Sequence, residues 1–214
     1  MKKILVLVAL AFSVMVSAQE KITEGKITSK QTMSTDNEQV QASLAMIGEI
    51  ETVTLFKGKN ARSESDNPMS GNIVTVVNTE ENKMLILMDN PALGKVYTVE
   101  SIELTEEDIK NIKVTKENET KEVLGYTCQK YTTSVTKNGV TVNMVMYTTE
   151  AIDVPNQQTA TLGEKVKGFP LYMEMKMNQM GVDMTIATEV TKIEKQSVSG
   201  DIFSVTPPEG YKKM

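Results

Sequence analysis

Alternation of apolar and polar residues is the dominant pattern along this chain. Most segments carry an apolar residue at every second position instead of every third or fourth, which is typical of strands that bury one face. The segment Ile50–Lys57, with the sequence I-E-T-V-T-L-F-K, shows this pattern clearly. Further segments of this kind are residues 22–29, Ile73–Asn78, Lys83–Met88, Lys95–Ser101, Val123–Thr136, Thr141–Thr148, Phe169–Asn178 and Val182–Glu194. The pattern therefore predicts a meander of antiparallel strands.

Three short connections between these segments predict hairpins. Thr79-Glu80-Glu81-Asn82 forms a four-residue loop between two β-rich runs. Asn138-Gly139 is the strongest turn signal, because this pair readily adopts the positive φ angles of a two-residue hairpin loop. Gln179-Met180-Gly181 joins the last two long segments. The strands on either side of each connection are expected to be neighbours in the sheet.

Helical patterns are few. We predict a short helix at Leu104–Ile112, because Thr105 is a good N-cap and three carboxylates follow at residues 106–108, where the helix dipole favours negative charge. Residues 33–48 carry apolar side chains at partly helical spacing, and both a helix and a strand fit this segment. The sequence therefore predicts a mainly β fold, a curved antiparallel sheet or half-barrel with one or two short helices.

The first eighteen residues form a pattern of their own. Lys2-Lys3 precede an apolar run from Ile4 to Val16, and the small residues Ser17-Ala18 follow. This is the arrangement of a cleaved secretory signal, and the apolar run of about 13 residues is shorter than the roughly 20 needed to cross a bilayer. We predict a signal peptide at residues 1–18 and a single β-rich domain at residues 19–214. The mature chain is expected to be exported and soluble, in the periplasm or outside the cell.

The net charge of the chain disfavours one class of partner. The chain has 23 Lys and Arg against 28 Asp and Glu, a net charge of −5, and loss of the two lysines in the signal brings it to −7. Arg62 is its single arginine. Nucleic acid is disfavoured, because binding to its phosphates needs clustered basic side chains. After residue 18 no apolar run is long enough to cross a membrane. No cysteine lies near the predicted cleavage point, so a lipoprotein is not expected.

The composition also excludes several kinds of catalysis. The chain has no histidine and one cysteine, so Ser-His and Cys-His nucleophiles and histidine-ligated metals are excluded within one chain. Acidic residues occur mainly as runs typical of solvated surfaces, and no calcium-loop or P-loop motif is present. A glycosidase pair of carboxylates stays open, because the separation of the two groups is a property of the fold. We predict a protein without enzymatic activity and without a cofactor.

Methionine is the distinctive residue, with 15 copies. Six methionines alternate on one face of three predicted strands, and we take them as the candidate lining of a binding site: Met144, Met146, Met173, Met175, Met177 and Met184. They fit a core in which methionine replaces leucine and valine, or a deformable cavity for an acyl chain or hydrophobic peptide. They also fit Cu(I) binding through Met173, Met175, Met177 and Met180, although no histidine or second cysteine completes the usual ligand set.

Cys128 is the only thiol in the chain. In an oxidising compartment an unpaired cysteine is either buried or able to bond to a partner. Catalysis would need a base or a cation beside the thiolate, and Lys130 is the nearest candidate in the sequence. Because histidine is absent, we expect a buried structural thiol, with a mixed disulfide to a partner protein as the alternative.

The residues around Cys128 form the most specific motif of the chain. The motif consists of Leu124, Gly125, Tyr126, Cys128, Lys130 and Tyr131. Together with Gly168-Phe169-Pro170-Leu171 and the ending D-I-F-S-V-T-P-P-E-G-Y at residues 201–211, it resembles a family of exported bacterial domains of unknown function with an L-G-Y-x-C-x-K-Y signature. That family is similar in architecture to the periplasmic lipoprotein-carrier superfamily (LolA/LolB-like). Members of the carrier superfamily are half-open antiparallel barrels around a hydrophobic cavity.

The resemblance implies a binding protein. We expect an exported, non-catalytic protein that holds a hydrophobic ligand, such as a lipid, an acyl chain or a lipoprotein-like segment, in a methionine-lined cavity. The alternative is a structural or envelope protein with a solid core that recognises another protein, and Cu(I) binding is a minor alternative. A cavity of at least about 300 Å³ lined by these methionines would favour the carrier, whereas a solid core would disfavour it.

Overall fold

The computed structural model describes residues 20–214 except residues 69, 138 and 180. The predicted signal peptide lies outside this part of the chain. The strands belong to one twelve-stranded sheet, which is antiparallel except for one pair and is not closed into a barrel. Strands account for 59% of the described residues and helices for 14%, which confirms a mainly β fold with short helices.

The strands follow one another closely along the chain. They are β1 (Glu24–Thr35), β2 (Ile50–Lys57), β3 (Asn60–Asn67), β4 (Gly71–Asn78), β5 (Lys83–Asn90), β6 (Gly94–Ser101), β7 (Ile112–Val123), β8 (Tyr126–Lys137), β9 (Val140–Thr149), β10 (Phe169–Gln179), β11 (Val182–Glu194) and β12 (Lys212–Lys213). The α-helices are α1 (Glu38–Ile47), α2 (Glu106–Asn111) and α3 (Gln157–Ala160). Two 3₁₀ turns are η1 (Gly163–Lys165) and η2 (Gly200–Phe203).

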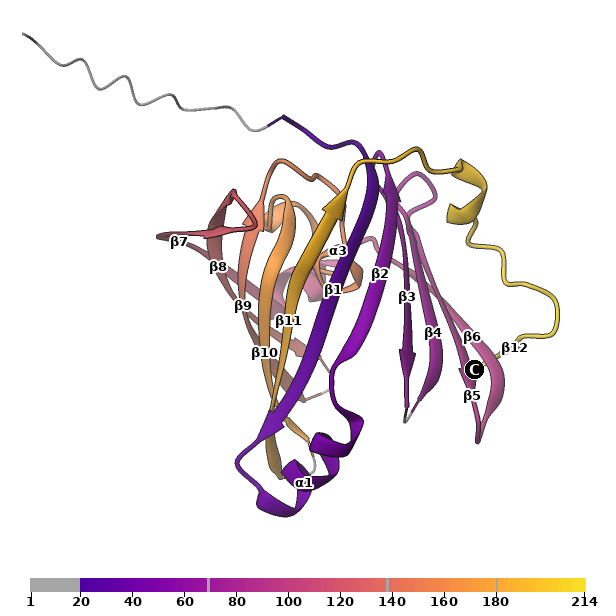
Figure 1. Cartoon of the computed structure of the whole chain (residues 1–214), viewed down its shortest axis with the longest axis vertical. Coiled ribbons are helices and arrows are strands. Elements are labelled where there is room, and N and C mark those ends of the chain that lie inside the picture. The colour runs from indigo at the N-terminus through magenta and orange to yellow at the C-terminus, as the bar shows by residue number, and fades with distance from the viewer. Residues whose placement is uncertain (1–19, 69, 138, 180) are drawn as a thin grey trace, which may run out of the picture.

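Two meanders make up the sheet. Strands β2 to β6 follow β1 in order on one side, and β10 to β7 follow β11 in reverse order on the other. The antiparallel pairing of β1 with β11 joins the two halves, from the pair Lys26–Glu194 to the pair Thr35–Met184. The two halves turn back from this central pair on either side of α3, which gives the sheet the form of a half-open trough (Figure 1).

The C-terminal segment 195–214 covers one face of the β2–β6 half, which we call the outer face. Val198, Phe203 and Val205 of this segment are buried against apolar side chains of β4 and β5. Because both faces of β4 and β5 are buried, these strands carry apolar residues at consecutive positions. The segment ends with β12, which pairs in parallel with the edge strand β6 (Figure 1).

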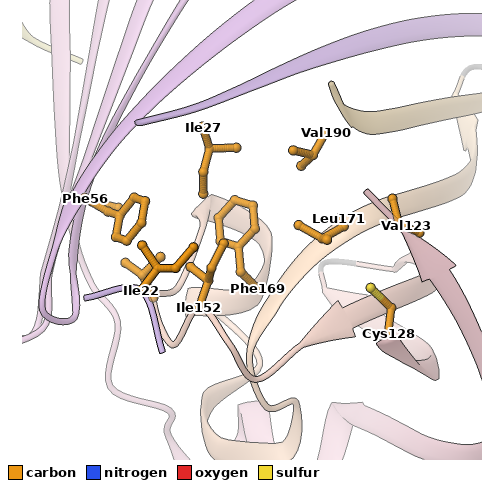
Figure 2. Close-up of a cluster of buried hydrophobic side chains, with 11 residues drawn as sticks. Ile22, Ile27, Phe56, Val123, Cys128, Ile152, Phe169, Leu171 and Val190 are labelled. Carbon is orange, nitrogen blue, oxygen red and sulfur yellow. The ribbon is translucent and has the colours of Figure 1, made fainter. Parts of the chain in front are cut away.

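The connection between β9 and β10, residues 150–168, packs on the opposite face, which we call the inner face. Its beginning is held by the Ile22 N–H, which donates to the Ala151 carbonyl at 2.7 Å. Its Ile152 is fully buried beside Ile22, Phe56 and Phe169, as Figure 2 shows. The connection places α3 against β4, between the β2–β6 half and the β7–β10 half of the sheet, which form the two wings of the trough.

Several predicted elements are confirmed. Strands β2 and β11 have the predicted bounds, and residues 79–82 connect β4 to β5 as a hairpin. Helix α2 follows Thr105, whose hydroxyl accepts a hydrogen bond from the Asp108 N–H while the Asp108 carboxylate accepts one from the Thr105 N–H. Asn138 and Met180 of the other two predicted turns lie outside the described residues, but the strands flanking each turn pair as antiparallel neighbours.

The strand predicted at Val123–Thr136 is confirmed as β8, but its predicted start was wrong, because β8 begins at Tyr126. Leu124 and Gly125 both have positive φ angles, 52° and 77°, and they form a two-residue hairpin loop between β7 and β8. Glycine adopts this conformation without strain, whereas leucine does so at a cost of about 1–2 kcal/mol. The ambiguous segment 33–48 contains the end of β1 and then α1, which begins after the N-cap Asn37.

Alternation does not predict β3 and β7. Strand β3, N-A-R-S-E-S-D-N, carries Ser63 and Ser65 at positions facing inward, so apolar residues are missing from both of its faces over most of its length. Strand β7, I-K-V-T-K-E-N-E-T-K-E-V, is the other edge of the sheet and has a register shift between Lys116 and Thr120. An edge strand, or a strand that faces a polar hollow, has little apolar surface to bury.

Gly168 provides a test of the connection that closes the inner face. A Cβ at this position would lie 2.2 Å from the Thr149 carbonyl oxygen, and its φ is 78°. We expect Gly168→Ala to lower the free energy of unfolding by about 3 kcal/mol or more. Gly94→Ala is the matched control, because φ is 73° there but no atom lies within 4 Å of the added Cβ; its expected cost is about 1 kcal/mol. Equal losses in urea unfolding would contradict the steric argument.

Candidate ligand-binding site

The six candidate methionines share the inner face of β9, β10 and β11. Cross-strand pairs join Met146 to Met173 and Met144 to Met175, and Met177 faces Met184 on the following strand. Residues paired in this way present their side chains on the same side of the sheet. The structure therefore brings all six predicted residues together on one surface.

Burial divides these six residues into two groups. Met144, Met146 and Met173 are buried beneath Leu162 and Val166 of the 150–168 connection, where they form part of the core. Met175, Met177 and Met184 are only partly buried. The first group matches the core interpretation of the methionines, and the second group stays accessible at one end of the inner face.

Two more apolar residues extend the accessible group. Met33 on β1 pairs with Ile186 on β11, and Ile186 pairs in turn with Met175 on β10. Both are partly buried. We call the accessible surface the apolar row, which consists of Met33, Met175, Met177, Met184 and Ile186. It crosses the three strands at the centre of the sheet.

A hollow of about 180 Å³ adjoins the apolar row on the same face. Gln31 and Thr188 line it, and they form the cross-strand pair next to Met33 and Ile186 on the inner face. Hydroxyl and amide side chains make up most of the lining, so we call it the hydroxyl pocket. These side chains are Ser29, Gln31, Thr52, Thr54, Ser63, Ser65, Asn67, Thr75, Asn156, Gln157, Gln158 and Thr188.

Short-range hydrogen bonds hold part of this lining in place. The hydroxyls of Thr54 and Ser63 lie 2.8 Å apart on adjacent strands. The Thr75 hydroxyl donates to the Gln157 side-chain oxygen of α3 over a longer distance, 3.5 Å. Thr54 and Thr75 are buried, 4% and 5% exposed. Residue patterns do not reveal this pocket, because a hydroxyl at every second position also fits a strand that faces water.

The other hollows described for this chain do not contain the six candidate methionines together either. One of about 590 Å³ is lined by the 150–168 connection, including Glu150 and Asp153, and by other residues such as Lys59. A hollow of about 470 Å³ contains Met177 and Met184, and one of about 340 Å³ contains Met144. Each of these four hollows is lined by at most two of the six methionines.

Cys128 is fully buried in the cluster around Leu171 and Val123 (Figure 2). Its thiol donates a hydrogen bond to the Tyr126 carbonyl at 3.4 Å, and burial raises the pKa of the thiol to about 11. A thiol in this setting is protonated near neutral pH and is a poor nucleophile. The expectation of a buried structural thiol is confirmed.

Lys130 of the same motif lies on the outer face beside Glu119 and Tyr147. Its ammonium is 2.7 Å from the Glu119 carboxylate, and this carboxylate also accepts a short hydrogen bond from the Tyr147 hydroxyl. These bonds raise the pKa values of Lys130 and Tyr147 and lower that of Glu119. Lys121 lies over the rings of Tyr147 and Tyr172. The cluster joins the bulged part of β7 to the neighbouring strands, a structural role that separate sequence segments do not reveal.

Metal binding has little support among the described residues. They contain no group of three or more His, Cys, Asp or Glu side chains arranged to hold a metal ion. Of the methionines proposed for Cu(I), Met173 is buried and Met180 lies outside the described residues. No helix in residues 20–214, leaving out the three undescribed positions, is long and apolar enough to cross a membrane.

The fold and the site define a class of domain, an open curved β-sheet with a hollow on its inner face. Within this class, residues 39–211 match the family described as "Domain of unknown function (DUF4412)", and the chain belongs to that family. The predicted relation to a family of domains of unknown function is confirmed, and its L-G-Y-x-C-x-K-Y signature stays a prediction. No curated protein matches the chain.

Solved structures with a similar arrangement include PNGF-II. Its C2 crystal form gives a TM-score of 0.51 at 14% identity, covering 89% of this chain and 31% of that one. Its P21 form gives 0.48 at 13% identity, covering 90% and 31%. The Mycobacterium tuberculosis lipoprotein LppX gives 0.33 at 10% identity, covering 82% and 89%. This chain spans about a third of the length of PNGF-II, and similarity at this identity shows the fold alone.

The buried state of Cys128 predicts slow thiol chemistry. A pKa of about 11 instead of 9.0 lowers the thiolate fraction at pH 8 by about a hundredfold. We expect Ellman's reagent to label the native protein at least that much more slowly than the urea-unfolded protein. Between pH 9 and 11 the unfolded thiol ionises before the native one, so stability falls as the pH rises. Cys128→Ala should remove this part of the decline, and rapid labelling of native protein would contradict the assignment.

Proposed function

We propose that this chain is an exported, non-catalytic binding protein that holds the apolar part of a ligand on the inner face of its sheet. The observation that carries this proposal is the apolar row, a set of partly buried side chains on the concave side of an open sheet. The row lies outside the core formed by Met144, Met146 and Met173. The signal-like pattern at residues 1–18 supports export.

The physical basis is the burial of apolar surface. Removing apolar surface from water gains about 25 cal/mol per Å², so full burial of one methionine side chain contributes about 1.5–3 kcal/mol. Unbranched thioether side chains adapt to ligands of different shape at low cost. An acyl chain laid along Met33, Met175 and Met177 would cover surface that the protein itself leaves accessible.

A structural protein that recognises another envelope protein is the second candidate. The packing of Met144, Met146 and Met173 beneath Leu162 and Val166 favours it, because this half of the inner face is solid. Under this alternative, the apolar row would be part of a protein contact and would not bind free alkyl chains. Cu(I) binding by Met175 and Met177 is a lesser alternative, which an anaerobic titration against a chelator tests directly.

Binding of a fluorescent fatty acid tests the proposed function. Mature protein should bind dansyl-undecanoic acid saturably, and Met177→Gln/Met184→Gln should weaken binding by about tenfold, because two adjacent apolar contacts are lost. Met46→Gln is the matched control, since Met46 is 88% exposed on α1, outside the row. Thermal melts establish that both variants fold. Absence of saturable binding by the unmodified protein, or equal loss in the control, would refute the proposal.

A further inference from the structure

The hydroxyl pocket has a chemistry that the apolar row does not explain. Its lining contains hydroxyls and amides from β1, β2, β3, β4, β11 and α3, but no Lys, Arg, Asp or Glu side chain. Six apolar residues complete the lining: Ile50, Ile73, Phe169, Pro170, Met173 and Val190. The pocket therefore offers many neutral hydrogen-bonding groups together with apolar side chains.

The absence of charge from this lining is specific to one face of the strands. On β3, the charged residues Arg62, Glu64 and Asp66 alternate with Ser63, Ser65 and Asn67, and only the three uncharged residues of this run line the pocket. On β1, Lys30 lies between the pocket residues Ser29 and Gln31 and pairs with Glu49 outside the pocket. Charge is thus abundant on the same strands and points away from the pocket.

This lining discriminates between ligand groups. A charged group would lose its hydration in a site that has no counter-charge, which is costly. A hydrocarbon chain would cover partly exposed hydroxyls such as those of Thr52, Ser65 and Thr188 and deprive them of water partners. An uncharged group with several hydroxyls or amides avoids both costs, because it exchanges hydrogen bonds with the lining.

The size of the pocket limits the group further. Its volume is about 180 Å³. One sugar ring or a polyol of similar size fits such a space, and the C–H face of a sugar ring matches a lining that contains Phe169.

We propose that the hydroxyl pocket binds one uncharged, hydroxyl-rich group of about the size of a sugar ring. The pair Gln31–Thr188 at the pocket is next to the pair Met33–Ile186 in the apolar row, so one ligand can reach both sites. The inference that one ligand occupies both sites rests on the proposed function. A ligand that spans both sites is an amphiphile with a neutral polar head and an apolar tail. The same head chemistry also occurs in a free sugar.

Calorimetry with matched probes tests the inference. The probes are the octyl glycosides of glucose, galactose and N-acetylglucosamine below their micelle concentrations, with octanol and octanoate as tails without a sugar. The corresponding methyl glycosides are the heads without a tail. At least one octyl glycoside should bind tenfold or more tightly than octanol and octanoate, because the head adds hydrogen bonds in the pocket.

Two variants locate the head. Thr54→Val/Ser63→Ala replaces both partners of one hydrogen bond, a change that leaves folding nearly unaffected, and it should weaken octyl glycoside binding by tenfold or more. Binding of dansyl-undecanoic acid should stay unchanged. Thr98→Val is the matched control, because Thr98 is a partly buried threonine on the inner-face side of β6 outside the pocket.

The outcomes separate the two proposals. If alkyl probes bind but no octyl glycoside exceeds octanol, the pocket holds water only, and the inference fails while the proposed function stands. If a methyl glycoside binds and the fatty acid does not, the pocket inference stands for a free sugar and the apolar function fails. If no glycoside and no alkyl probe binds, both fail.

Discussion

Pairing of β1 with β11 is the contact on which the rest of the structure depends. Within each half, neighbouring strands follow one another along the chain, whereas the β1–β11 ladder pairs two strands that are distant in sequence, joins the halves and sets their register. The hydroxyl pocket and the apolar row draw side chains from both sides of it, as the pairs Gln31–Thr188 and Met33–Ile186 show. A shift of one residue in this ladder would turn the side chains of one strand to the opposite face. The inner face therefore forms a binding surface only after β1 and β11, which are far apart in the sequence, have paired.

The inner face has three chemically distinct zones. Methionines under Leu162 and Val166 make a solid core on the β7–β10 wing, and Val77 and Met84 pack against Ala160 on the other wing. Between the wings lies the hydroxyl pocket, and beside it the partly buried apolar row. Filling the central zone with apolar side chains would bury more hydrophobic surface and would give a more stable sheet. Hydroxyls at these positions are thus a departure from the most stable arrangement, as is common where a protein binds a ligand.

Apolar periodicity predicted those parts of the structure that bury one face. Strands β2 and β11 and the shared face of the six methionines followed from alternation, because apolar residues recur at every second position on one of their faces. Strand β3 did not, because its inward positions are Ser63 and Ser65. The pocket was not predicted for the same reason, since six elements each supply one to three hydroxyl or amide side chains to it. The burial of Met146, in contrast to the accessibility of Met177, depends on where the 150–168 connection crosses the face, and this path has no signal in the strands themselves.

An open sheet has two edges, and this one protects them in different ways. Edge strand β6 is paired with β12, so its free backbone groups are partly occupied by the end of the same chain. Edge strand β7 carries Lys113, Lys116 and Lys121 among its glutamates and is interrupted by a bulge. Charge and irregular geometry at an edge prevent strands of separate molecules from adding to the sheet. Both edges therefore disfavour strand addition from other molecules, and loss of residues 212–214 would remove the strand that covers part of β6.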